Sequence, residues 1–325
     1  MNESKARVWK KIACFYALTI LFSFLFGAFI LHAGKLDAGN LLYVTGTMWS
    51  PGLAAFATKK IFGENIRDLP WRWGTARYAW LAYLVPIGYA LPVYLVVWLT
   101  GLGAFDASIL SRITADFGLQ NFPWPVALAV FVLITATVGM VGKLSRALGE
   151  EIGWRGFLVP ELSKVVGFPG IGLISGLMWA AYHYPVLLFA DYNAGTPAWY
   201  SVTCFTISVV GGSFIMAWLT LRARSLWPAA ILHASHNLFI QSILTPLTKD
   251  TGPTKFITDE FGIGLVITVT VAVIVVLTIR KSSRAANGGF VAETGFKKTV
   301  PGLSQEGHSH AGQKARALEP EPRRE

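Results

Sequence analysis

The stretch IACFYALTILFSFLFGAFIL, residues 12–31, decides the class of fold because it contains no charged residue. A bilayer core about 30 Å thick is crossed by about 20 predominantly apolar residues in a helix. The stretch GIGLVITVTVAVIVVLTI, residues 262–279, has the same character. Both stretches predict membrane-spanning helices, and we therefore expect an integral membrane protein.

The composition of the whole chain agrees with this expectation. Of its 325 residues, 53% are hydrophobic and only 14% are charged, whereas a soluble domain carries about 25% charged residues. This balance excludes a disordered chain, a collagen and a coiled coil as well as a soluble globule. Cys14 and Cys204 both lie inside apolar runs, so they indicate neither a disulfide framework nor a thiolate metal site.

The expected fold class is an all-α, polytopic transmembrane helix bundle of about eight spans. The expected spans are residues 12–32, 41–58, 79–102, 123–142, 170–190, 198–221, 226–246 and 262–279. Pro51 interrupts the second span, but neighbouring groups in a bundle can satisfy the carbonyl that a proline frees. The first span has the basic start of a signal peptide, yet its apolar run exceeds the usual length of about 7–15 residues, so we expect it to be retained.

The distribution of basic residues predicts the orientation of the bundle. If the N-terminus is cytoplasmic, 24 of the 28 Lys and Arg fall in cytoplasmic segments. The other four are Lys35, Arg112, Lys249 and Lys255. Such asymmetry is typical of cytoplasmic loops, so we expect both termini in the cytoplasm and the protein in the plasma or inner membrane of the cell. The net charge of +10 then reflects topology and anionic lipid heads, not nucleic-acid binding.

Changes in composition divide the chain into four expected segments. Residues 1–142 hold the N-terminal spans, and residues 143–246 hold most of the polar motifs within apolar sequence. Residues 247–280 contain the last span. Residues 281–325 are rich in Gly, Ser, Pro and charged residues without apolar periodicity, which predicts a disordered cytoplasmic tail.

The first polar motif is GEEIGWRG, residues 149–156, in a stretch that reads as a helix. Glu151 and Arg155 are spaced i,i+4, which suits an ion pair along one helix face. Glu150 projects about 100° away from Glu151, and a carboxylate facing a partly dry pocket is a capable general base toward water. The alternative is a salt-bridged helix at the membrane interface with no chemical role.

The second motif, WAAYH, ends at His183 within the expected fifth span. Ionisable groups inside a membrane are expensive, so their presence needs a reason. Either His183 contributes to a functional site, or it is a neutral, hydrogen-bonded packing residue.

The third motif, HASHN, begins at His233 within the expected seventh span. His233 and Asn237 are i,i+4 neighbours, so both can donate hydrogen bonds from one face of a rigid helix. His236 lies near the same face, so it is an alternative to His233 as the hydrogen-bond donor. The alternative is that these side chains only join helices by hydrogen bonds.

In this order on membrane helices, Glu-Glu-x-x-x-Arg, aromatic-x-x-x-His and His-x-x-x-Asn resemble the CAAX prenyl protease family of the Rce1 type. That family belongs to a wider group of intramembrane glutamic endopeptidases that includes bacterial self-immunity proteins. The resemblance covers roughly residues 145–239 and departs from the family pattern at Trp179, where Phe is usual. The matching positions are Glu150, Glu151, Arg155, His183, His233 and Asn237.

The resemblance implies an endopeptidase that cuts a membrane-associated protein or peptide, prenylated ones included. Glu150 and His183 would orient and deprotonate a water. His233 and Asn237 would donate hydrogen bonds to the developing oxyanion, a contribution often worth about 3 kcal/mol per donor. The pair Glu151 and Arg155 would hold the catalytic helix. The partners implied are the lipid bilayer and the tethered peptide, without nucleic acid.

The resemblance does not decide whether catalysis uses a metal ion, because the family was long described as metal-dependent. Glu150, His183 and His233 could hold zinc with one open position. No His-Glu-x-x-His motif occurs in the chain, so the usual zinc-protease arrangement is absent. We therefore favour metal-free glutamate catalysis without a cofactor. Rhomboid chemistry is disfavoured because Leu173 replaces the glycine that a Gly-x-Ser-Gly motif needs.

Two non-proteolytic functions compete with this hypothesis. A membrane binding or bacteriocin self-immunity protein of the same fold would use the polar residues only as structural contacts. A transporter with a polar site at the membrane midplane would be favoured by inverted repeats and broken helices, and we find no internal repeat.

Overall fold

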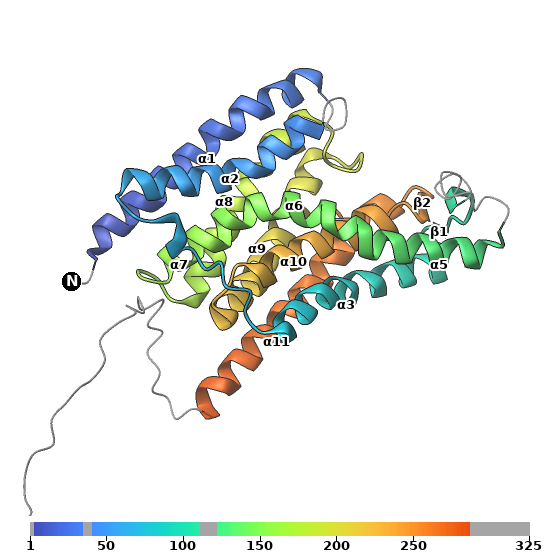
Figure 1. Ribbon diagram of the computed structural model, residues 1–325. Coiled ribbons are helices and arrows are strands. Elements are labelled where there is room, and N and C mark those ends of the chain that lie inside the picture. Colours follow the sequence, from blue (N-terminus) through green and yellow to red (C-terminus); the bar gives the residue numbers. More distant parts are fainter. Residues whose placement is uncertain (1–2, 35–40, 111–121, 287–325) are drawn as a thin grey trace, which may run out of the picture.

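The computed structural model of the protein describes residues 3–34, 41–110 and 122–286. Within these ranges the chain is almost entirely helical, and the one sheet pairs the two-residue strands β1 (Ala104–Phe105) and β2 (Thr248–Lys249). Figure 1 shows the helices packed as a single bundle. The all-α class is confirmed.

The helices fall close to the ranges that the apolar pattern predicts. The α-helices are α1 (Lys5–Ala33), α2 (Leu41–Ile61), α3 (Ala76–Thr100), α5 (Trp124–Ile134), α6 (Met140–Glu151), α7 (Val159–Leu162), α8 (Phe168–Phe189), α9 (Ala198–Ala223), α10 (Trp227–His236) and α11 (Ile263–Ala286). Three π-helical segments adjoin them, namely η2 (Thr135–Gly139), η3 (Ile152–Leu158) and η4 (Asn237–Leu244). Short 3₁₀ turns, η1 (Ile66–Asp68) and η5 (Thr254–Phe256), lie in the connections.

Six helical segments in the described ranges are long and apolar enough to cross a bilayer. They are Lys5–Ala33, Ala76–Thr100, Trp124–Leu162, Phe168–Phe189, Ala198–Ala223 and Ile263–Ser282. The other two expected spans, 41–58 and 226–246, are also helical, as α2 and as α10 with η4. The protein is thus a polytopic membrane helix bundle, while the number of crossings stays a prediction.

Two helices continue beyond the limits that the sequence suggested. The expected break after residue 142 does not occur, because α5, α6 and α7 join through η2 and η3 into one run of 39 residues. Lys143 and Arg146 do not interrupt this run, since Lys and Arg are good helix formers. At the other end, α11 continues to Ala286, so the start of the expected tail is helical. The rest of that tail, 287–325, lies outside the described residues.

Glycines allow α2 to approach the helix that carries the first polar motif. A Cβ atom at Gly153 would lie 2.6 Å from the carbonyl oxygen of Pro51, and one at Gly149 would lie 2.7 Å from the ring of Trp49. Both distances are shorter than any real contact of a Cβ atom. Small residues that let helix backbones meet are typical of membrane bundles. The glycines of the GEEIGWRG motif therefore set the position of Glu150 and Glu151 against α2.

A buried aromatic cluster fixes the same motif from another side. The rings of Phe15 on α1 and Trp154 on η3 lie 5.6 Å apart, and those of Trp154 and Tyr182 on α8 lie 5.7 Å apart, both edge to face. Aromatic pairs in this geometry contribute about 0.5–1.5 kcal/mol beyond burial of their area. The cluster joins α1, η3 and α8 around the polar motifs.

A network of ion pairs closes the end of the bundle that carries the amino terminus. The Nζ atom of the fully buried Lys11 lies 2.8 Å from Glu64 and 2.7 Å from Glu161. Burial alone would raise the pKa of Glu64, but hydrogen bonds from Lys11 and Lys59 outweigh it and lower that pKa from 4.5 to about 2. The network joins α1, the α2–α3 connection and α7.

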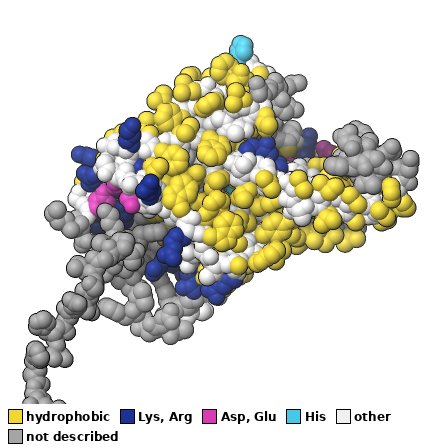
Figure 2. Space-filling view, viewed as in Figure 1, with side chains coloured by type: hydrophobic (Ala, Val, Ile, Leu, Met, Phe, Trp, Pro, Cys, Tyr) yellow, Lys and Arg dark blue, Asp and Glu magenta, His cyan; other side chains and the backbone are white. Residues whose placement is uncertain are grey.

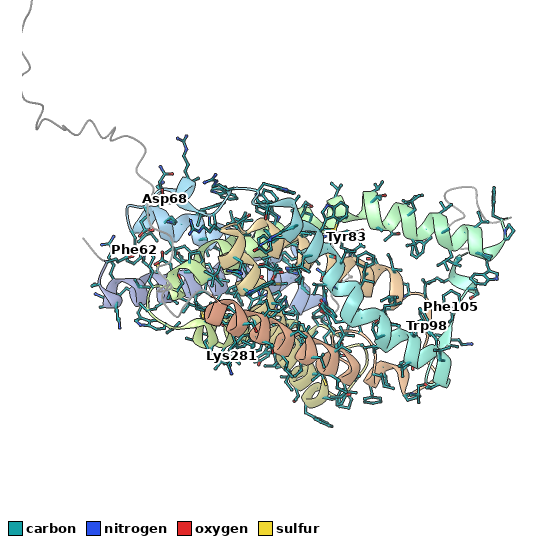
Figure 3. All side chains as sticks on the ribbon, turned by 90° about the horizontal axis from the view of Figure 1, so that it is seen from below. Phe62, Asp68, Tyr83, Trp98, Phe105 and Lys281 are labelled. Carbon is teal, nitrogen blue, oxygen red and sulfur yellow. The ribbon has the colours of Figure 1, made fainter. Side chains whose placement is uncertain are left out.

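The surface between the two ends of the bundle is apolar. Hydrophobic side chains cover most of the face seen in Figure 2, while Lys and Arg gather toward the amino-terminal end. Figure 3 shows Phe62 and Asp68 at one end of the molecule and Trp98 and Phe105 at the other. Leu99 keeps 83% of its surface exposed, which a lipid environment explains better than water.

Candidate active site

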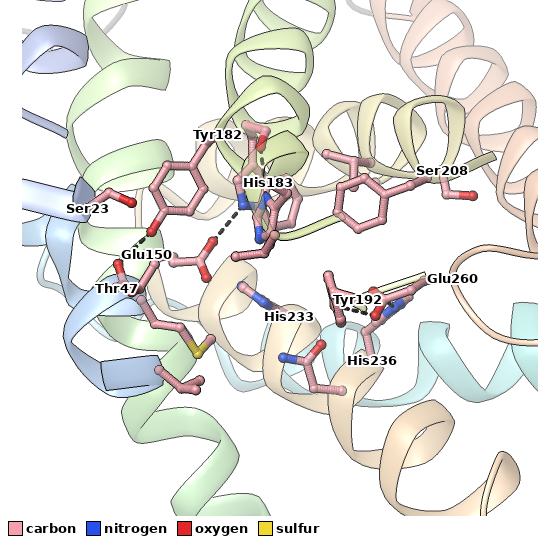
Figure 4. Close-up of a pocket in the computed structure, with 18 of the residues that line it drawn as sticks. Ser23, Thr47, Glu150, Tyr182, His183, Tyr192, Ser208, His233, His236 and Glu260 are labelled. Carbon is pink, nitrogen blue, oxygen red and sulfur yellow. Dashed lines mark hydrogen bonds and ion pairs between the residues drawn. The ribbon is translucent and has the colours of Figure 1, made fainter. Parts of the chain in front are cut away.

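The four polar side chains with a predicted chemical role line one pocket with a volume of about 270 Å³. Glu150 comes from α6, His183 from α8, His233 from α10 and Asn237 from the first position of η4. Figure 4 shows Glu150, His183 and His233 around the same space. The structure therefore brings together groups that are distant in sequence.

Glu150 is almost fully buried, with 2% of its surface exposed. Its Oε2 atom accepts a hydrogen bond of 2.6 Å from the indole Nε1 of Trp179 on α8. Hydrogen bonds to an ionised acceptor are about twice as strong as neutral ones. The bond fixes one carboxylate oxygen of Glu150.

Glu151 and Arg155 lie behind the pocket rather than in its wall, and both are fully buried. The expected ion pair is present, with Nη1 of Arg155 2.8 Å from Oε1 of Glu151. The guanidinium also donates to Oγ of Ser213 at 3.0 Å and lies 4.2 Å from the centre of the Trp179 ring. The pair thus joins the first motif to α8 and α9.

His233 is held by the same carboxylate. Its Nδ1 atom lies 2.9 Å from Oε1 of Glu151, and an ionised carboxylate only accepts hydrogen bonds, so Nδ1 carries a proton. The ring packs edge to face on Trp179 at 5.2 Å. This leaves Nε2 of His233 as the ring nitrogen available to the pocket.

His183 is oriented by its own helix. Its Nδ1 atom lies 2.9 Å from the carbonyl oxygen of Trp179, one turn earlier. Because a carbonyl only accepts, Nδ1 carries the proton, and the neutral ring then presents an unprotonated Nε2. The ring lies between Tyr182 and Phe205, at 5.0 and 5.2 Å. The ring of His183 is therefore held in the pocket wall by its own helix and by two aromatic side chains.

The first and third motifs lie at junctions between α- and π-helix. Glu151 is the last residue of α6 before η3, and Asn237 is the first residue of η4 after α10. Such π-segments are frequent at functional sites because they re-aim the side chains beside them. Composition and periodicity predict only a helix at these positions, so the junctions are visible only in the structure.

His236 takes a different place from His233. Its Nδ1 atom lies 2.7 Å from the hydroxyl of Tyr89, and its Nε2 atom lies 3.6 Å from Oε2 of Glu260. Glu260 and Tyr192 also line the pocket, although our sequence reasoning did not select them. The signal was present, since Asp259 and Glu260 are adjacent acids immediately before an uncharged span.

The preference for metal-free catalysis over a zinc site stays a prediction. In the described parts of the chain, no three or more His, Cys, Asp or Glu side chains are grouped so that they can hold a metal ion. In particular, Glu150, His183 and His233 share a pocket without forming such a group. We therefore derive no chemical step through a metal.

Comparisons with known proteins match the part of the chain that contains the three polar motifs. Residues 119–239 match the family model "Type II CAAX prenyl endopeptidase Rce1-like", and this range contains all six predicted site residues. CAAX prenyl protease 2 of Methanococcus maripaludis is 28% identical to the chain over 115 residues. That alignment covers 33% of the chain and 41% of the relative, so the chain matches less than half of the relative's length.

Proposed function

We propose that this membrane protein is an intramembrane endopeptidase, because residues 119–239 match the model of the Rce1-like family of type II CAAX prenyl endopeptidases. It hydrolyses a peptide bond in a membrane-associated protein or peptide, prenylated ones included. The observation that carries the proposal is the meeting of Glu150, His183, His233 and Asn237 in one buried pocket. Apolar side chains of α1 and α2, among them Phe24 and Val44, extend that pocket and suit the lipid of a tethered substrate.

In this proposal, Glu150 and His183 activate the attacking water. Trp179 fixes Oε2 of Glu150, so Oε1 takes a proton from a water that the unprotonated Nε2 of His183 orients. The water oxygen then bonds to the carbonyl carbon of the substrate. General base catalysis of this kind contributes about 10²–10⁴-fold to a rate. Glu150 next passes the proton to the leaving amine as the C–N bond breaks.

His233 and Asn237 stabilise the oxyanion of the tetrahedral intermediate. The amide of Asn237 is a hydrogen-bond donor in its neutral state. His233 donates to Glu151 through Nδ1, so it can donate to the oxyanion only as an imidazolium protonated on both nitrogens. Glu151 faces that charge directly, and Arg155 holds Glu151 in place. In this mechanism Glu151 and Arg155 position His233 and do not touch the substrate.

The test uses the full-length protein in lipid vesicles with a library of lipid-anchored peptides, prenylated ones included. We expect cleavage by the parent and a loss of at least about a hundredfold in the Glu150→Gln variant. Asp68→Asn is the matched control, because it also changes an acid to an amide but lies exposed in η1. Cleavage by Glu150→Gln at the parent's rate would refute the mechanism.

The same variants separate the protease from a non-catalytic protein of this fold. A membrane binding or self-immunity protein would still bind its partner or protect the cell when the cell carries the Glu150→Gln or the His183→Ala variant. A protease that acts through these residues would no longer protect the cell. We further propose that the protein resides in the plasma or inner membrane with both termini in the cytoplasm, as the basic residues predict. An active site that faces the cytoplasm fits this topology less well, because Tyr192 and Glu260 of the pocket lining lie in connections that the same topology assigns to the opposite side.

A further inference from the structure

A second polar cluster lies in the same pocket, beside the proposed catalytic residues. It consists of Glu260, His236, Tyr192 and Gln241, all of which line the cavity. Figure 4 shows Tyr192, His236 and Glu260 together on one side of the pocket, with Glu150 on the other side. The proposed mechanism uses none of these four side chains. Glu260 and Gln241 also lie outside the segment 119–239 that matches the family model.

Two elements hold the carboxylate of Glu260 in place. Its Oε1 atom accepts hydrogen bonds from the hydroxyl of Tyr192, in the connection after α8, and from Nε2 of Gln241 on η4 at 2.9 Å. Donors of this kind favour the ionised carboxylate. Glu260 is 7% exposed, so it is a buried anion built into the pocket wall.

The other oxygen of Glu260 faces a histidine without a close bond. Its Oε2 atom lies 3.6 Å from Nε2 of His236, which is longer than an ordinary N–H···O hydrogen bond. The hydroxyl of Tyr89 contacts the opposite ring nitrogen of His236 at 2.7 Å. When Nδ1 of His236 carries the proton and donates it to the hydroxyl of Tyr89, Nε2 is an acceptor. A ligand with several N–H donors can then bond to both Oε2 of Glu260 and Nε2 of His236 and join the two side chains.

The charges around the pocket favour a cation. Glu150 and Glu260 are two carboxylates in the lining, while the lining described contains no Lys or Arg. Lys143 on α6 acts on Glu260 only through its long-range charge and forms no ion pair with it among the described residues. A carboxylate of the substrate would be repelled at this position, and an ammonium or guanidinium would be attracted.

We propose that Glu260, together with His236, binds a basic side chain of the substrate and so determines specificity. His233 and His236 are three residues apart on α10, which separates them by about 4.5 Å along the helix axis. Since an extended chain advances about 3.3–3.6 Å per residue, the basic residue lies within about two residues of the scissile bond. This inference rests on the proposed function, because it assigns the substrate class of that site.

A purely structural role predicts something different. If Glu260 only fastened the loop before α11 to η4, its removal would lower the stability of the protein and weaken the binding of every substrate equally. A binding subsite instead predicts an effect confined to substrates with a basic residue. The experiment must therefore compare peptides that differ in one side chain.

Binding is measured on the full-length Glu150→Gln variant in lipid nanodiscs, so that no turnover is needed. The probes are fluorescent lipid-anchored peptides identical except for Lys, norleucine or Glu near the scissile bond. We expect the Lys peptide to bind at least about tenfold more tightly than the norleucine peptide, since a hydrogen bond to a charged group is worth about that factor or more. Adding Glu260→Gln should abolish the difference and leave norleucine binding unchanged.

Asp250→Asn is the matched control, because it removes an exposed acid from the same connection and should keep the Lys preference. Equal binding of the Lys and norleucine peptides by the Glu150→Gln parent would overturn the inference. So would a preference that survives Glu260→Gln, or a loss of affinity common to all three peptides. If no peptide is cleaved by the wild-type protein but the Glu260-dependent preference is present, the proposed function fails while the basic-ligand subsite stands.

Discussion

At the scale of single residues, Trp179 connects the two acids of the first motif. Its indole N–H donates to Glu150, and the face of its ring lies on the guanidinium of Arg155, which pairs with Glu151. In the family that the motifs resemble, Phe is usual at this position. A phenyl ring can make the contact with Arg155 but has no N–H, so Glu150 of this protein has one donor more.

We predict that Trp179→Phe lowers kcat/KM toward a lipid-anchored peptide by about tenfold. The variant keeps an aromatic ring on Arg155 but loses a charge-assisted hydrogen bond, which is worth about 1.5–3 kcal/mol. Stability should change less than activity, because water in the pocket can hydrate Glu150. The measurements are steady-state kinetics and the thermal unfolding midpoint.

Trp199→Phe is the control for this substitution, since Trp199 on α9 is 72% exposed. It should leave both the rate and the unfolding midpoint unchanged. An unaltered rate in Trp179→Phe would show that the bond to Glu150 does not position the base.

The residues with a local signature could be predicted from sequence, and those that depend on tertiary contacts could not. The Glu151–Arg155 pair follows from an i,i+4 spacing on one helix. Glu260 is different, because it lies in a connection and approaches His236 only when η4 and α11 are packed together. No spacing rule links the two positions.

At the scale of elements, the approach of α2 to the first motif depends on glycine. Gly153 lies against the backbone of Pro51, where any Cβ atom would be 2.6 Å from the carbonyl oxygen. The same long helical run contains Gly142, which has no atom within 4 Å of such a Cβ position. The two glycines therefore offer a matched pair, one in a tight contact and one in open space.

We predict that Gly153→Ala destabilises the protein and reduces its activity, whereas Gly142→Ala does neither. Overpacking of this kind costs typically about 1–3 kcal/mol, and relief of the clash would push the helix with Glu150 away from α2. Gly142→Ala should be neutral or slightly stabilising, because Ala is a better helix former by up to about 1 kcal/mol. Thermal unfolding and peptide cleavage measure both variants, and equal behaviour of the two would show that the close approach is unimportant.

Apolar periodicity predicts where helices occur, but not how they continue or bend. The expected ranges for α1, α3, α8, α9 and α11 are close to those observed. The continuous run through α5, α6 and α7 was not predicted, because the expected fourth span ends at residue 142 and the basic residues after it were assigned to a cytoplasmic segment. The π-segments were missed too, since their backbone bonding depends on tertiary packing and not on side-chain type.

At the scale of the whole molecule, contacts between distant connections sort the helix ends into two faces. On one face, the carbonyl oxygen of Trp71 accepts a hydrogen bond of 2.8 Å from Nε1 of Trp227, which joins the α2–α3 and α9–α10 connections. On the other face, β1 pairs with β2, which joins the connections that follow α3 and η4. α3 and the α10–η4 segment thus run in the same direction through the bundle.

The first face also carries the amino-terminal ion pairs. Lys11 contacts Glu64 in the α2–α3 connection and Glu161 on α7, so three sequence-distant segments meet there. Each of them belongs to a segment that the distribution of Lys and Arg assigns to the cytoplasm. The charge asymmetry and the packing are independent observations, and both sort these connections in the same way.

We therefore predict that Arg72 faces the cytoplasm and Lys249 faces the opposite side of the membrane. Both side chains are exposed. The side of the membrane assigned to each residue follows from the face on which its connection lies. Arg72→Cys and Lys249→Cys are introduced singly after Cys14 and Cys204, the two natural cysteines, are replaced by Ala. In intact cells a membrane-impermeant maleimide should label Lys249→Cys, and it should reach Arg72→Cys only after permeabilisation. Reversed labelling would invert the topology. Labelling of both sites in intact cells would mean that the two faces lie on one side of the bilayer, which a helix bundle that crosses the membrane along α3 does not permit.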